Sequence, residues 1–357
     1  MSENTNTTKR RSAIQIMGSL IGLVKPLLHI MLAAIILGTL GYLCAIFLTI
    51  LAGQVIMHGL LTGVAGMIVP VDNMWRVFTP VKTIITVMIV IAVLRGILHY
   101  VEQYCNHFIA FKLLAIIRHK VFAALRKLCP AKLEGRDKGN LISIITTDIE
   151  LLEVFYAHTI SPIAIATLTS IIMVIFIGRY HWLAGVIALV AYLIVGVVIP
   201  MWNGKRGSQK GMEFRTNFGE LNSFVLDSLR GLDETIQYGQ GEKRKEQMSE
   251  HSKNLAGMQE SLSKMEGSQR SFTNMVILLA SFGMLALTIW LYDKGAMGFE
   301  GILTCTIAMM GSFGPVVALS SLSNNLNQTL ASGERVLSLL EAVSYTHLRA
   351  HETPEHL

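Results

Sequence analysis

Six stretches of the chain are each long and apolar enough to cross a lipid bilayer, and this feature limits the fold more than any other. A helix needs about 20 apolar residues to cross the bilayer core. The stretches cover about 26–52, 77–101, 160–178, 182–203, 271–292 and 299–322. Only 15% of the 357 residues are charged, and the mean hydropathy is +0.51, outside the range of soluble domains. We therefore predict an all-α membrane protein with six spans.

A polar tail and two shorter apolar stretches lie before and between these spans. Residues 1–12 form a polar N-terminal tail, and the apolar run Ala13 to Val24 ends at Lys25-Pro26. That run is too short for a span, so we expect a helix lying at the membrane interface. The apolar stretch 56–70 is also short and is interrupted by three glycines, so we interpret it as an outer loop rather than a seventh span.

The distribution of basic residues predicts the orientation. Segment 105–160 carries eight Lys or Arg residues and segment 203–270 carries eleven, whereas the three opposite loops contain only Arg76, Arg179 and Lys294. Basic residues are enriched in cytoplasmic loops. We therefore expect both long segments and both termini in the cytoplasm.

The helix of the second span is expected to continue well beyond the lipid. Apolar residues keep a helical spacing from residue 104 to 128, and basic residues lie between them. The apolar positions are Phe108, Phe111, Leu114, Ile117, Val121 and Leu125. About 25 residues at 1.5 Å each extend roughly 35–40 Å, and Pro130 ends the pattern because proline lacks an N–H.

A second pair of helices repeats this arrangement. Apolar stripes run away from span four and back towards span five, separated by a bend at Gly231 to Arg244. The outgoing stripe is Phe218, Leu221, Val225, Leu229 and Leu232, and the returning one is Met248, Leu255, Met258, Leu262 and Met265. In the first hairpin, the stretch "KGNLISIITTDIELLE" (138–153) begins at a glycine and places its apolar residues on one helix face. We predict two long helical hairpins, each ending in a short helix.

These residues resemble the transmembrane half of ATP-binding-cassette exporters. The resemblance covers about residues 12–342 and is carried by three motifs in order. They are "LRKLCPAKLEGRDKGNLISIITTDIELLEVFYAHTISP", "LNSFVLDSLRGLDETIQYGQGEKR" and "ALSSLSNNLNQTLASGERVLSLLEA". Within the family, the amino-acid sequence around residues 100–160 is most similar to that of bacterial subunits related to thiol-reductant exporters.

The resemblance implies that residues 139–147 and 231–238 are coupling helices, which dock on nucleotide-binding domains. The first would use Gly139, Asn140, Leu141, Ser143, Thr147 and Asp148. The second would use Gly231, Leu232, Asp233, Glu234, Gln237 and Tyr238. The implied partners are the lipid bilayer, nucleotide-binding domains and a second half-transporter, either identical or different; no nucleic acid is expected.

No residue pattern for ATP binding is found in the printed sequence. It contains neither G-x-x-x-x-G-K-[ST], whose backbone cradles phosphates, nor L-S-G-G-Q. We expect the membrane domain to span 13–342, with the nucleotide-binding domain, its ATP and its Mg²⁺ absent from this chain. The chain alone is then not an enzyme and has no catalytic, cofactor or metal residues. The polar segment 343–357 is interpreted as a non-native tail; a native disordered tail is the alternative.

Three ionisable residues mark a candidate substrate path. Arg95, His99 and Glu102 occur at i, i+4 and i+7 on one face of the second span. Ionisable groups inside spans are costly and are therefore candidates for function. One hypothesis is that this face lines a cavity and binds a polar or anionic substrate through Arg95. The alternative is structural, with Arg95 pairing with Glu102 or reaching the inner headgroups.

Two other functions compete with an ATP-driven exporter subunit. A secondary transporter would have acidic pairs or broken helices deep in its spans and short cytoplasmic loops. In this sequence the middles of the spans are almost free of Asp and Glu, and the loops are long. A non-transporting scaffold or receptor, whose hairpins only dock a signalling partner, has no distinguishing sequence feature and stays open.

Overall fold

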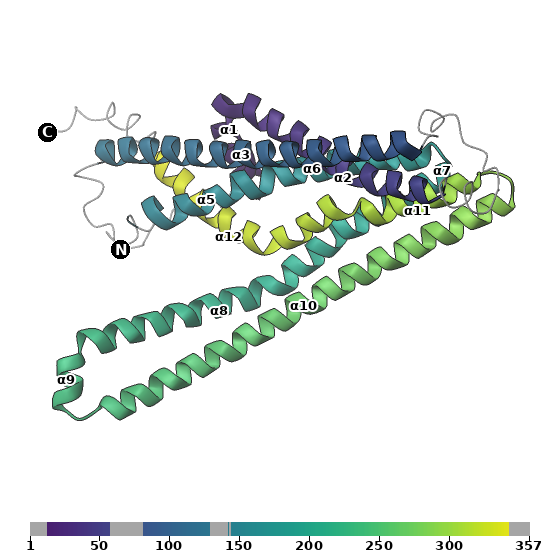
Figure 1. The fold of residues 1–357 in the computed structure, drawn as a ribbon. Helices are drawn as coiled ribbons and strands as arrows, with labels where there is room; N and C mark the ends of the chain where they lie inside the picture. Colours follow the sequence, from purple (N-terminus) through teal and green to yellow (C-terminus); the bar gives the residue numbers. More distant parts are fainter. Residues whose placement is uncertain (1–12, 58–80, 129–141, 143, 343–357) are drawn as a thin grey trace, which may run out of the picture.

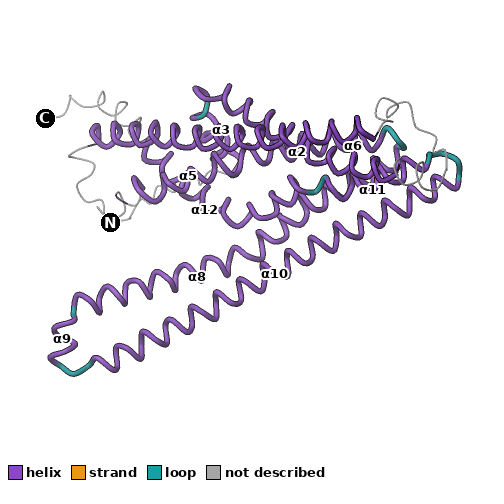
Figure 2. The backbone as a smooth tube through the Cα atoms, in the orientation of Figure 1, coloured by secondary structure: helices purple, strands orange, loops and turns teal. Residues whose placement is uncertain are grey.

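The computed structural model describes residues 13–57, 81–128, 142 and 144–342, and the regular structure within these ranges is entirely helical (Figures 1 and 2). The longer helices are α1 (Ala13–Leu23), α2 (Leu28–Ile56), α3 (Val81–Leu128), α6 (Ser161–Gly178), α7 (Trp182–Leu193), α8 (Ile199–Arg230), α10 (Gly241–Asp293), α11 (Phe299–Gly311) and α12 (Gly314–Ala342). The shorter ones are α5 (Ile149–Phe155), α9 (Leu232–Gln237), the 3-10 turn η1 (Lys25–Leu27) and the π-helical turns η4 (Ile144–Asp148), η5 (Tyr156–Ile160) and η6 (Ile194–Val198).

Six helical runs in the described residues are long and apolar enough to cross a membrane. They are Lys25–Ile56, Lys82–Leu128, Ile144–Gly178, Trp182–Gly204, Gly241–Asp293 and Phe299–Leu319. The predicted all-α class with six membrane helices is confirmed. The proposed outer loop lies almost entirely outside the described residues, as do the tails 1–12 and 343–357.

Several of these helices are much longer than a bilayer is thick. Helix α3 has 48 residues and α10 has 53, which at 1.5 Å per residue gives about 70–80 Å, against about 30 Å for the lipid core. The expected helical extension over 104–128 is therefore confirmed. The stretch from Ile144 joins the third span in one run through η4, α5 and η5. A π-helical turn precedes Pro162, at a point where proline removes a backbone N–H.

The first hairpin is held in a compact body by a hydrophobic core. Helix α5 contacts both α3 and α12, and α1 contacts α12. The core contains Ile117 and Val121 from α3 together with Ile149 and Leu152 from α5. The hydroxyl of Tyr156 donates a hydrogen bond of 2.9 Å to the backbone oxygen of Leu20, which ties α1 to the body. Of the apolar stripe predicted on α3, Leu114, Ile117 and Val121 pack in this core, whereas Phe108 and Phe111 are exposed, so that part of the prediction is wrong.

The second hairpin, α8–α9–α10, extends away from this body (Figure 1). No side chain between residues 200 and 272 whose burial the structure describes is buried. Among the described residues, the contacts between its two long helices include ring pairs and a hydrogen bond. Trp202 lies 5.9 Å from Phe272, Phe224 lies 5.3 Å from His251 (centroid distances), and the ammonium of Lys210 donates to Ser261. The side chains described in this hairpin therefore form no buried core between its two long helices.

Both hairpins extend to the same end of the molecule. Figure 1 places the far end of α3, the start of α5 and the tip α9 on one side, and the turns between α6 and α7 and between α10 and α11 on the other. At that second end, α6 and α7 approach each other at Gly178 and Gly185. Because both residues lack a side chain, the two backbones come into direct contact.

Replacing Gly185 with alanine is expected to destabilise this end. An added Cβ would lie 2.9 Å from the Cα of Gly178 and 3.3 Å from the backbone oxygen of Val174, so the helices must separate. Overpacking of this kind costs about 1–3 kcal/mol. Thermal unfolding in detergent measures the effect. Gly283→Ala is the matched control, because a Cβ there meets no atom within 4 Å, and its midpoint should not fall. Equal midpoints for the two variants would contradict the close approach.

Candidate functional site

A cavity of about 380 Å³ lies between α2 and α3. Its lining residues are Gly38, Gly41, Tyr42 and Ala45 from α2, and Ala92, Arg95, Gly96, His99 and Glu102 from α3. Five of these nine residues are glycine or alanine, so the space between the helices is left open. The three residues predicted as a substrate path therefore line one cavity.

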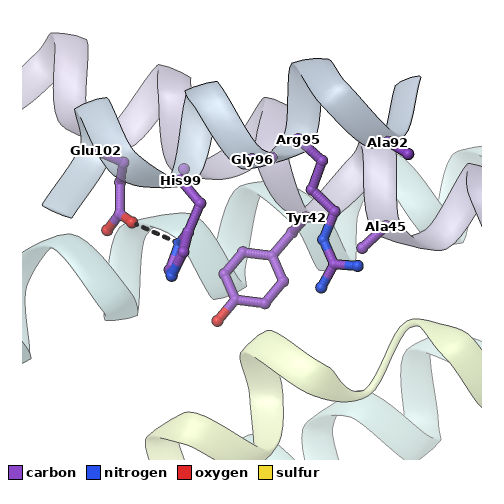
Figure 3. A pocket seen from close by; sticks show the side chains of 9 residues that line it. Tyr42, Ala45, Ala92, Arg95, Gly96, His99 and Glu102 are labelled. Carbon is purple, nitrogen blue, oxygen red and sulfur yellow. Dashed lines mark ion pairs between the residues drawn. The ribbon is translucent and has the colours of Figure 1, made fainter. Parts of the chain in front are cut away.

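The polar groups of this cavity project from one side of the helix pair. The side chains of Tyr42, Arg95 and His99 point in the same direction in Figure 3. Arg95 and His99 are exposed to this space. Tyr42 comes from the neighbouring helix and was not anticipated, because no sequence pattern indicates which α2 face meets α3.

Glu102 is buried and its carboxylate is surrounded by donors. Its Oε1 accepts a hydrogen bond of 2.6 Å from the Asn106 amide, and its Oε2 accepts one of 3.1 Å from the Gln103 amide. The Nδ1 of His99 lies 3.3 Å from the same Oε2. Glu102 thus pairs with His99, and the anticipated pairing with Arg95 is not formed. His99 and Glu102 are three positions apart and are therefore direct neighbours on the helix surface. Arg95 and Glu102 are seven positions apart, which separates them by two helical turns.

The residues assigned to the first coupling helix are only partly described. Gly139, Asn140, Leu141 and Ser143 lie outside the described residues, and Thr147 in η4 is exposed. Asp148 is buried and faces α12. Its carboxylate accepts a hydrogen bond of 3.0 Å from the Ser332 hydroxyl and lies 3.1 Å from the Arg335 guanidinium. Asp148 therefore attaches this end of the first hairpin to α12.

The residues assigned to the second coupling helix form the exposed tip of the second hairpin. Gly231 precedes α9, and Leu232, Asp233, Glu234, Gln237 and Tyr238 are all exposed. Ile236, which was not anticipated as a site residue, is 69% exposed, and Tyr238 is 72% exposed. Gly239 has a φ of 65°, which is favourable for glycine and allows the chain to reverse into α10. The tip therefore presents apolar side chains to solvent.

No group of three or more His, Cys, Asp or Glu side chains in the described part of the chain is arranged to hold a metal ion. The cavity between α2 and α3 and the tip at α9 are two features of the described residues that suit a functional role. They belong to a multi-pass helical membrane protein whose helices continue as hairpins beyond the lipid.

Comparison with known proteins identifies the family. Residues 27–316 match the ABC transporter transmembrane region, and the chain belongs to this family. It is 42% identical over 334 residues to a "Probable ABC transporter ATP-binding/permease protein" of Haemophilus influenzae, covering 93% of this chain and 58% of that protein. The expected exporter-type membrane domain is therefore confirmed.

Two more distant relatives have named cargoes. The glutathione/L-cysteine transport system protein CydC of Haemophilus influenzae is 20% identical over 73% of this chain and 46% of its own length. The ATP-dependent lipid A-core flippase of Escherichia coli K12 is 23% identical over 72% of this chain and 44% of its own length. The chain spans about half the length of the curated relatives that it matches.

Proposed function

We propose that the chain is the transmembrane subunit of an ATP-driven exporter. It would form the translocation path and convert closure of nucleotide-binding domains into alternating access. The observation that carries this proposal is the second hairpin, which ends in a short helix with Leu232 and Ile236 exposed. An exposed apolar patch at the end of a projecting element is typical of a protein-docking surface.

The geometry of the hairpins suits them to transmit movement. From Gly241 to Arg270, α10 extends roughly 45 Å before its apolar span begins. A displacement of α9 along the helix axes would reach the membrane part of α8 and α10. The first hairpin would follow α12 through the contact of Asp148 with Arg335. ATP and Mg²⁺ would bind in the nucleotide-binding domains.

The basic residues near the span ends favour tips on the cytoplasmic side. We propose that the chain lies in a bacterial cytoplasmic membrane with both termini inside, in keeping with this charge distribution. A second half-transporter would complete the path, and nucleotide-binding domains would seat both tips. The named relatives act on glutathione or L-cysteine and on lipid A-core, so the family's cargoes range from small solutes to lipids.

The proposal predicts that this chain binds the ATP-binding portion of its 42% identical relative. The chain would be placed in lipid nanodiscs and mixed with that portion, expressed separately. We expect association and a change in the rate of ATP hydrolysis, because docked tips constrain domain closure. Empty nanodiscs are the control. Absence of association would reject the exporter function, and association without any change in hydrolysis would favour a scaffold.

A further inference from the structure

The cavity between α2 and α3 is lined by one arginine, Arg95, and one acidic residue, Glu102. Among the described residues, Arg95 has no hydrogen-bond or ion-pair partner. The one acidic residue of the lining, Glu102, already accepts from Asn106 and Gln103 and faces Nδ1 of His99. The charge of Arg95 is therefore unopposed in this cavity.

An unopposed guanidinium in this position is costly. Arg95 lies 14 residues after Val81, which is about 21 Å along α3, within a span whose core is about 30 Å thick. A charged group at such depth is unfavourable unless it meets water or a counter-charge. An oxyanion offers both oxygens to a guanidinium in a paired, planar geometry, which a single water cannot do.

His99 supplies a second contact beside Arg95. Its Nδ1 faces the Glu102 carboxylate, which fixes the ring and leaves Nε2 as the nitrogen available to a ligand. The two residues are four apart, so they lie about 6 Å from each other along the helix axis. The spacing suits a small molecule with an anionic end and a second polar group.

We propose that this cavity binds the carboxylate of a small anionic solute, with Arg95 as the main binding residue and His99 as the second. Glu102 is a positioning residue that acts through His99. The inference rests on the proposed function, because it assigns a cargo class to the same path. The cavity volume and its glycine and alanine walls suit a small solute rather than an acyl chain.

The first test is protection of Arg95 from a reagent specific for arginine. The chain in phosphatidylcholine nanodiscs is treated with phenylglyoxal, and modification is followed by mass spectrometry. Succinate should slow modification of Arg95, and its neutral diamide should not. Arg118, an exposed arginine on the same helix, is the internal control and should react equally in all conditions. Equal rates at Arg95 with succinate and with the diamide would overturn the proposal.

The second test measures binding of radiolabelled succinate to variants. Arg95→Gln should lower the affinity about tenfold or more, and Arg95→Lys should lower it less, because the charge remains but the paired geometry is lost. Arg118→Gln should have no effect. Glu102→Gln should weaken succinate binding when His99 is present. In the double variant with His99→Ala, Glu102→Gln should cause no further loss of affinity. Unchanged affinity in Arg95→Gln would overturn the assignment, and independent effects of Glu102→Gln would remove its positioning role.

A lipid headgroup is the other source of an oxyanion. The footprint is therefore repeated in nanodiscs containing phosphatidylglycerol. If phosphatidylglycerol alone protected Arg95 and succinate had no further effect, the ligand would be a lipid phosphate rather than a solute. This result would overturn the proposal. These experiments use no ATP and no nucleotide-binding domain. Their failure is thus distinguishable from failure of the exporter function, which depends on docking at the tips.

Discussion

The Ile236→Asp variant is expected to bind nucleotide-binding domains at least about thirtyfold more weakly than the unchanged chain. Ile236 is exposed at the tip of the second hairpin, among the apolar side chains proposed to dock. A charge placed in the apolar centre of an interface typically costs 2 kcal/mol or more. The affinity is measured with the chain in nanodiscs and the separately expressed ATP-binding portion of the relative.

The same variant should unfold at an unchanged temperature, because an exposed side chain contributes little to the fold. Ser249→Asp is the matched control, since Ser249 is exposed on the same hairpin but lies on α10 away from the tip. Its affinity should equal that of the unchanged chain. If both aspartate variants bound equally well, the tip would not be the docking surface.

Removing the guanidinium of Arg335 is expected to destabilise the body of the molecule. The Asp148 side chain is only 5% exposed and would lose its charge partner, keeping the hydrogen bond from Ser332. Breaking a buried pair costs about 3–5 kcal/mol, but the Arg335 side chain is 42% exposed, so we expect about 1–3 kcal/mol for Arg335→Ala. Thermal or denaturant unfolding measures this loss.

Two comparisons test the cause of that loss. Arg118→Ala breaks a pair with Glu150 whose two side chains are both exposed, and such pairs contribute at most about 1 kcal/mol. A cycle of Arg335→Ala, Asp148→Asn and the double variant isolates the interaction between the two residues. Purely additive effects would show that the ion pair does not join α12 to the first hairpin.

The sequence predicted the long helices well because their signals are local. A span needs only a run of apolar residues, and an extension needs only a repeated spacing of three and four. The faces predicted to pack around Ile149 and Leu152 are buried for the same reason. The second hairpin departs from this rule. Its stripes pack only partially, and Phe218 and Leu229 remain exposed; on α3 the predicted stripe likewise leaves Phe108 and Phe111 exposed.

The contacts between distant segments were beyond sequence reasoning. Asp148 and Arg335 are separated by 187 positions, and Tyr156 and Leu20 by 136, so no periodic pattern connects them. At the cavity, the common face of Arg95, His99 and Glu102 followed from helical spacing. The choice of His99 as the partner of Glu102, and the contribution of Tyr42, required the packed structure.

The second hairpin, whose described side chains form no buried core, has a mechanical consequence. Two antiparallel helices of this kind resist compression along their axes through backbone hydrogen bonds, but they can bend together. The force that reaches the membrane from α9 is then limited by how easily α8 and α10 bend. Their resistance to unfolding is not the limit. A force applied to α9 along the axes of α8 and α10 would reach the membrane, whereas a force applied across these axes would bend the two helices.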